Sequence, residues 1–195
     1  MHLRKYSDAG QAFPIYITVV AGLLFLAFAY FAVGQAAANR NGAQTAADAA
    51  ALAAAQDTRD KLADLWVTNV LDPTKWQDIF DGNQAVPSCT RAYGLAAQND
   101  ATVLSCAPGL LSYTVQVQTD ESVGHSVVPG TENIKSTAKA TAVIEALCTF
   151  QLPGADAGPD TLPQLTCKDR NWDLDPKDLS NLPKPQDLFD VHLAD

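Results

Sequence analysis

The chain has four cysteines: Cys89, Cys106, Cys148 and Cys167. None belongs to a Cys-x-x-Cys motif, and the three histidines (His2, His125 and His192) lie far apart in the sequence. This spacing does not favour a zinc site. An even number of cysteines in an exported chain is typical of disulfides, and four cysteines allow three pairings. The sequential pairing, Cys89 with Cys106 and Cys148 with Cys167, closes the shortest loops and is the one we expect.

An acidic segment near the C-terminus resembles the first half of a calcium-binding loop, because oxygen-bearing side chains alternate at Asp169, Asn171, Asp173 and Asp175. The likeness then ends. Leu174 replaces the turn glycine, and Ser180 stands where the bidentate acid belongs. We therefore expect a solvated acidic loop without a metal ion.

The sequence gives no arrangement for catalysis. The histidines are isolated, oxidised cysteines supply no thiolate nucleophile, and no glycine loop for phosphate is present. We expect neither an enzyme nor a bound cofactor. The 195 residues carry a formal net charge of −9, which argues against nucleic acid as a partner.

One uninterrupted apolar stretch, Ala12–Val33, has no charged residue. As a helix it reaches across a hydrocarbon core of about 30 Å. It is longer than the apolar region of a signal peptide, so a retained transmembrane helix is favoured over a signal cleaved near Ala38. Arg4 and Lys5 precede it, which predicts a cytoplasmic segment 1–11 and an extracellular remainder. Membrane lipid is therefore an expected partner.

The segment 34–72 has high helix propensity and no proline, and Asp72-Pro73 is expected to end the helix. Four alanines recur at helical spacing on one stripe: Ala43, Ala47, Ala50 and Ala54. We expect this stripe to pack against another helix, and the alternative is a solvated spacer helix without a partner. Asn39-Arg40-Asn41-Gly42 is the one place where a bend is plausible.

Residues 73–150 predict a small α+β head. Its expected elements are a short helical turn at Trp76–Phe80, a helix at Cys89–Asn99 and β segments at 101–106, 112–119 and 136–147. About three antiparallel strands would then form one sheet. The segment 151–195 is rich in proline and aspartate and is expected to be an irregular tail. Its apolar exceptions, which would pack onto the head or a partner, are Trp172, Leu182, Leu188 and Phe189.

Two N-terminal motifs together resemble those of a known family. Asp8-Ala9-Gly10-Gln11 precedes the span, and the alanine-rich run Ala43–Ala55 follows it. This order is similar to the N-terminal signature of TadE/TadG-like proteins of tight-adherence, Flp-type pilus systems. A prepilin cut after Gly10 would carry Ile15 where type IV-like prepilins have a glutamate.

The resemblance implies a pseudopilin-like structural or assembly component in the cell membrane. Such a protein would cross the membrane once and pack its N-terminal helix against other pilin-like or pilus-assembly subunits. The alternative is a membrane-tethered extracytoplasmic binding or cell-envelope module outside a pilus.

Overall fold

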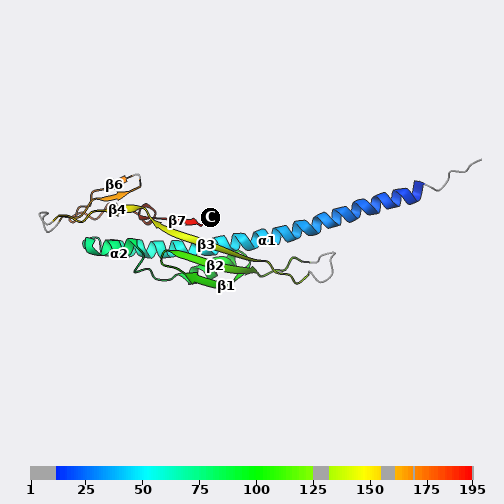
Figure 1. The fold of residues 1–195 in the computed structure, drawn as a ribbon, viewed down its shortest axis with the longest axis horizontal. Helices are drawn as coiled ribbons and strands as arrows, with labels where there is room; N and C mark the ends of the chain where they lie inside the picture. The colour runs from blue at the N-terminus through cyan, green and yellow to red at the C-terminus, as the bar shows by residue number, and fades with distance from the viewer. Residues whose placement is uncertain (1–11, 125–131, 155–160, 169, 195) are drawn as a thin grey trace, which may run out of the picture.

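One long helix organises the fold. The structure is a computed structural model that describes residues 12–124, 132–154, 161–168 and 170–194. Helix α1 (Ala12–Thr68) has 57 residues, about 85 Å from the rise of an α-helix. The other elements gather on its C-terminal half (Figure 1). The helix is unbroken through Asn39–Gly42, where the sequence permitted a bend.

Three short helical elements follow α1. The 3₁₀ helix η1 (Pro73–Lys75) leads directly into α2 (Trp76–Phe80), and α3 (Cys89–Gln98) packs beside α1. Helix α1 ends at Thr68, slightly before the predicted Asp72-Pro73. The chain turns between these points, where the Asp72 N–H donates to the Asn69 carbonyl at 2.9 Å. Both predicted helices of the head are present.

The main sheet is antiparallel, with the strand order β1-β2-β3-β7. Its bounds are β1 (Ala101–Pro108), β2 (Ser112–Thr119), β3 (Thr137–Ala146) and β7 (Phe189–Leu193). The first three strands lie where alternating polarity predicted them. Tyr113, Val115 and Val117 of β2 are buried, as that alternation requires. The predicted α+β fold class is confirmed.

The segment expected to be an irregular tail is more ordered than its composition suggested. It supplies β5 (Leu165–Cys167) and β6 (Arg170–Trp172), which form a second sheet with β4 (Cys148–Phe150), and then α4 (Pro185–Leu188) and β7. Strand β7 extends the main sheet from the expected three strands to four. It forms because Phe189, Val191 and Leu193 alternate with polar residues and pack on the core.

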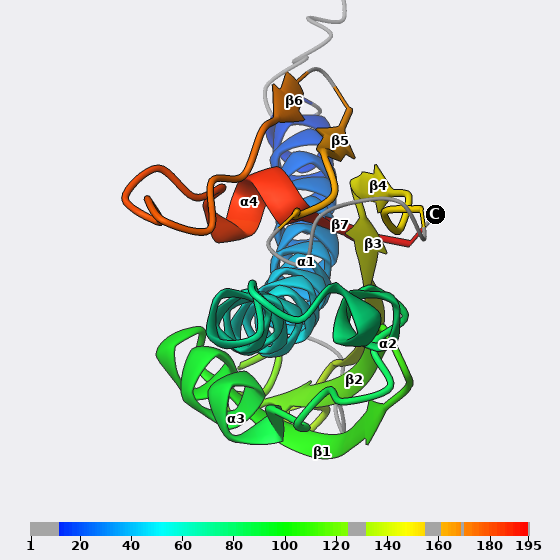
Figure 2. The same ribbon diagram turned by 90° about the vertical axis from the view of Figure 1, so that its left-hand side faces the viewer.

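The core lies between α1 and the sheet. Figure 2, which looks along α1, shows the strands curving around one side of the helix and α3 beside it. The helix presents alanines to this surface, and seven of them are completely buried: Ala43, Ala46, Ala47, Ala50, Ala51, Ala54 and Ala55. Methyl side chains let the helix and sheet backbones approach closely. Larger side chains, Leu62 and Trp66, take over toward the C-terminal end of α1.

An aromatic cluster closes that C-terminal end. Trp66 of α1 contacts Trp76 with ring centroids 5.3 Å apart, and Trp76 meets Phe150 at 5.2 Å. Phe80 joins the cluster and contacts Phe189 at 5.5 Å. The rings come from α1, α2, β4 and β7, so this cluster fixes both the second sheet and the C-terminal strand to the helix.

The close packing at the alanines predicts the effect of enlarging one of them. Ala50→Leu inserts three heavy atoms where Ala50 is 0% exposed, and we expect it to lower the free energy of unfolding by about 1–3 kcal/mol. Ala53→Leu is the matched control. Ala53 borders an open groove between α1 and α3, so we expect a larger side chain there to change the stability little. Urea unfolding followed by circular dichroism measures both, and equal stabilities would contradict the packing described.

Candidate functional site

The N-terminal half of α1 extends beyond the head without covering elements. Large apolar side chains are exposed along it, among them Phe25 at 72% and Phe31 at 63%. The others are Phe13, Ile15, Tyr16, Ile17, Val19, Leu23, Leu24, Leu26, Phe28, Tyr30 and Val33. A surface this apolar is unstable in water, so lipid or other apolar helices must cover it.

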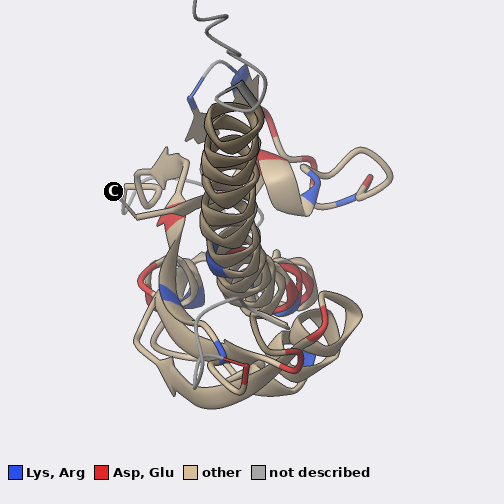
Figure 3. Cartoon of the chain, turned by 90° about the vertical axis from the view of Figure 1, so that its right-hand side faces the viewer, with Lys and Arg blue, Asp and Glu red and all other residues tan. Residues whose placement is uncertain are grey.

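This projecting half has the properties of a membrane span. No charged residue occurs between Ala12 and Asn39, and Figure 3 shows the projecting turns of α1 in tan. Its most apolar window has a mean hydropathy of 2.3, and none of that window is buried. The Thr18 hydroxyl donates to the Pro14 carbonyl at 2.8 Å, so a polar side chain is satisfied within the helix. The chain therefore has one helix, within its described residues, that is long and apolar enough to cross a membrane.

The predicted packing stripe is covered by elements of its own chain, and one of the elements that pack on α1 is the helix α3. Ala43, Ala47, Ala50 and Ala54 are all 0% exposed, and elements of the same chain cover them. In this structure the stripe packs on the sheet and α3 of its own head, so it is not open to a helix of another subunit. Ala140 and Ala142 of strand β3, which contacts α1, are small and buried as well.

The boundary between the bare and covered halves of α1 lies at Asn39. The Asn39 side-chain amide donates to the Glu121 carbonyl at 3.2 Å, and the Thr119 hydroxyl donates to the Asn39 side-chain oxygen at 3.4 Å. The first fully buried helix residue is Ala43. These contacts tie the end of β2 to the helix just beyond the apolar segment.

A polar cluster joins α1 to the start of α3. Asp57 accepts from Lys61 at 2.7 Å and lies 3.9 Å from the Arg91 guanidinium, and Lys61 also donates to the Ser88 hydroxyl at 2.8 Å. Partial burial alone would raise the pKa of the Asp57 carboxyl. Hydrogen bonds involving Lys61 and Ser88, with the charges of Lys61 and Arg91, outweigh this and hold the pKa below its ordinary value of 3.8. The resulting stabilisation is present above that pH and is lost as the pH falls through the lowered pKa.

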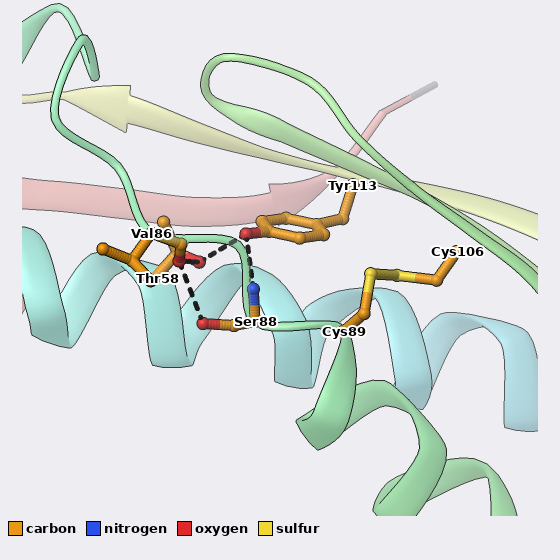
Figure 4. Close-up of a disulfide and its surroundings, with 6 residues drawn as sticks. All are labelled: Thr58, Val86, Ser88, Cys89, Cys106 and Tyr113. Carbon is orange, nitrogen blue, oxygen red and sulfur yellow. Dashed lines mark hydrogen bonds between the residues drawn. A yellow bond between two sulfur atoms is a disulfide. The ribbon is translucent and has the colours of Figure 1, made fainter.

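Deeper in the same junction, Tyr113 links the sheet to α1 and to the loop before α3 (Figure 4). Its hydroxyl lies 2.6 Å from the Thr58 hydroxyl and accepts the Ser88 backbone N–H at 3.0 Å. Tyr113, Thr58 and Ser88 are each 2% exposed or less. These three partners therefore satisfy one another in a place that water does not reach.

Both disulfides follow the sequential pairing. Cys89–Cys106 joins the first residue of α3 to β1, beside the Tyr113 junction (Figure 4). Cys148–Cys167 joins facing residues of β4 and β5 in the second sheet. Each bridge fixes a short element that has little core of its own.

The described residues contain no cluster of three or more histidine, cysteine or acidic side chains able to hold a metal ion. Of the calcium-like segment, Asp169 lies outside the described residues, as do Arg4, Lys5, Gly10 and His125. His192 lies on β7 beside Asp190, with its Nδ1 3.2 Å from the carboxylate, and its side chain is half exposed. This pair has no nucleophile beside it among the described contacts, and we assign it no chemistry.

Comparison with known families gives one match, and it covers most of the N-terminal helix. Residues 10–57 match the family model described as putative Flp pilus-assembly TadE/G-like. This match confirms, over the N-terminal helix, the resemblance predicted from the sequence. The matched range runs from the start of the apolar segment through the buried alanines, whereas the sheet, α3 and the disulfides lie outside it. The comparisons with curated proteins and with solved structures gave no match.

The Tyr113 junction yields a second prediction. Tyr113→Phe keeps the ring but leaves the Thr58 hydroxyl and the Ser88 N–H without this partner, so we expect a loss of about 1–3 kcal/mol in the free energy of unfolding. Tyr93→Phe is the control, because the Tyr93 side chain is 53% exposed. Thermal unfolding with the disulfides intact measures both. A Tyr113 variant as stable as the control would show that the buried hydroxyl does not hold the junction.

Proposed function

We propose that the chain is a membrane-anchored, pseudopilin-like structural or assembly component of a tight-adherence, Flp-type pilus or secretion system. The observation that carries this proposal is that the TadE/G-like region coincides with a helix whose apolar half is bare. A rigid helix that is buried in its own head at one end and uncovered at the other is suited to holding a folded head against a membrane or an assembly.

The proposed orientation places the N-terminus in the cytoplasm and the head outside the cell. Arg4 and Lys5 precede the apolar segment, and the first basic residue after it is Arg40. Two disulfides in the head favour an oxidising compartment, which is consistent with an extracellular location. These two arguments are independent, because one uses charge and the other uses cysteine chemistry.

We propose that contacts with other subunits are made by the apolar segment of α1 and not by the alanine stripe. The stripe is covered by the chain's own head, whereas side chains such as Val19 and Phe28 are exposed at 54% and 56%. In a membrane these side chains can pack against spans of other pilus-assembly subunits or against lipid tails. Contacts made by the outer surface of the head would add to this packing.

The proposed role is structural and not catalytic. The family to which residues 10–57 belong is one of assembly components. The polar contacts of Asp57 and Tyr113 join α1 to the start of α3 and to the sheet, which is a structural role.

The proposal predicts contacts between the span and identified subunits. A photo-crosslinking amino acid is introduced in place of Phe28 in cells that assemble the pilus, and the products are identified by mass spectrometry. We expect adducts with other components of the same pilus system, because Phe28 is uncovered within the matched region. Val86, a head residue with a similar exposure of 59%, is the control for random collision in the extracellular space.

The crosslinking experiment has a clear negative result. If the probe at Phe28, and equivalent probes at Val19 and Phe25, form adducts only with lipid while pili assemble, the span is an anchor and not a packing surface. The assembly role by helix packing would then be wrong, and the membrane anchor would stand.

A further inference from the structure

An open groove of about 420 Å³ runs between α1 and α3, and its lining comes from these two helices alone. Figure 2 shows α3 beside α1. Ala49, Leu52 and Ala53 of α1 and Leu95 of α3 give the groove an apolar floor, and each of these side chains is only half-buried. Among the described residues, no element of the chain fills the groove.

The groove is the end of a longer exposed face of α1. Residues at alternating steps of four and three lie on one side of a helix. Eight such residues lead from the apolar segment to the groove, and none of them is buried or charged: Phe31, Gln35, Ala38, Gly42, Thr45, Ala49, Leu52 and Gln56. We call them the outer face of α1, and the last three line the groove. Heptad spacing over this length is typical of a helix that packs lengthwise on another helix.

Gly42 lies in the middle of the outer face and weakens the helix there, because glycine inside a helix is less stable than alanine. A Cβ atom added at Gly42 would meet no described atom within 4 Å, so the fold of the head does not require glycine at this position. The lack of a side chain does let the backbone of another helix approach closely. Gly42 is therefore suited to a neighbouring helix on the outer face.

Membrane anchoring restricts how a second copy can lie on this face. Helix α1 is unbroken from Ala12 to Thr68, so two copies anchored in one bilayer hold their α1 helices parallel. A two-fold axis parallel to both helices places each outer-face residue opposite the same residue of the other copy. Each α1 then lies in the groove of the other copy, and both grooves are filled at once. Gln35 and Gln56 share one heptad position, where polar side chains fix the register of paired helices.

The charges at the groove permit a second copy, although the chain as a whole has a net charge of −9. Four charged side chains line the groove, two of each sign: Asp57, Asp60, Arg59 and Arg91. Arg59 and Asp60 are bonded at 2.8 Å, and Arg91 lies 3.9 Å from Asp57. Lys61 and Asp64, next along α1, add one charge of each sign, whereas Asp48 lines a different hollow together with Lys139. Two copies can therefore meet at the groove without net repulsion.

We propose that the occupant of the groove is a second copy of this chain, and that two copies form a symmetric dimer in the bilayer through their outer faces. Each copy contributes an apolar floor, a balanced set of charges and an unpartnered face at heptad spacing. The dimer rests on the proposed membrane span, because the span is what holds the two α1 helices parallel. It would present two heads side by side to other pilus-assembly subunits.

Photo-crosslinking of the purified full chain, with its disulfides intact, tests the dimer. The protein is reconstituted at a low ratio of protein to lipid in vesicles of phosphatidylcholine and phosphatidylglycerol, and carbonate extraction reports whether it is inserted. Benzoylphenylalanine replaces Gln56 in one variant and Gln77 in the control. Both glutamines are exposed, but Gln77 lies on α2 and does not line the groove. A third variant combines the probe at Gln56 with Ala53→Glu.

We expect the probe at Gln56 to give a covalent dimer of twice the chain mass, with the crosslinked peptide on α1 or α3 of the second copy. The probe at Gln77 should give no dimer above the level of random collision. Ala53→Glu should abolish the dimer adduct, because it places a carboxylate in the contact between two helices. Circular dichroism checks that this variant keeps its fold, since Ala53 borders the open groove.

Other results overturn defined claims. If the inserted chain gives no more dimer from Gln56 than from Gln77, or if Ala53→Glu leaves the adduct unchanged, the groove contact is wrong and the membrane span stands. Failure of the chain to insert overturns the span, and the parallel dimer with it. The same Gln56 probe is also used in cells that assemble the pilus. Adducts there with a different pilus component and none with a second copy would overturn the choice of occupant, while the proposed pilus role would stand.

Discussion

The close approach of the sheet to the alanine face of α1 is the interaction on which the rest of the structure depends. Each alanine buries little surface, so the face stabilises the head only because many methyl groups are covered together without gaps. The seven completely buried alanines lie on α1 between Ala43 and Ala55. The aromatic cluster around Trp66 and the Tyr113 junction then fix the far end and the flank of this contact. Without the alanine face, the strands would have no helix to curve around.

Because α1 is continuous, its packing in the head also determines how the apolar segment outside the head is oriented. The same helix leaves the core at about Asn39 and continues as a bare apolar rod, so the orientation of the head follows that of the span. A flexible linker would let the head and the apolar segment reorient independently, whereas an unbroken helix couples their orientations. The TadE/G-like match includes both the apolar segment and the buried alanines, which suggests that this coupling belongs to the matched unit itself.

Strong local signals in the sequence predicted most elements correctly. The apolar run, the proline-free alanine segment and the alternation at Tyr113, Val115 and Val117 are each visible within one element. The surface against which the alanine stripe packs was not predictable in the same way, because a face of methyl groups fits a sheet and a partner helix equally well. Strand β7 was missed for a different reason. Its pairing with β3 joins residues far apart in the sequence, and the prolines around it outweighed the short alternation at Phe189–Leu193.

The central claim is that one rigid helix joins the span to the core of the head, and a distance across the boundary tests it most directly. Spin labels at Phe28 and Asp64, both exposed on α1, can be measured by pulsed dipolar spectroscopy in the membrane-inserted protein. A continuous helix predicts a single narrow distribution centred at about 54 Å, from the rise per residue. A broad or distinctly shorter distribution would show that the helix bends at Asn39–Gly42 and would contradict the account.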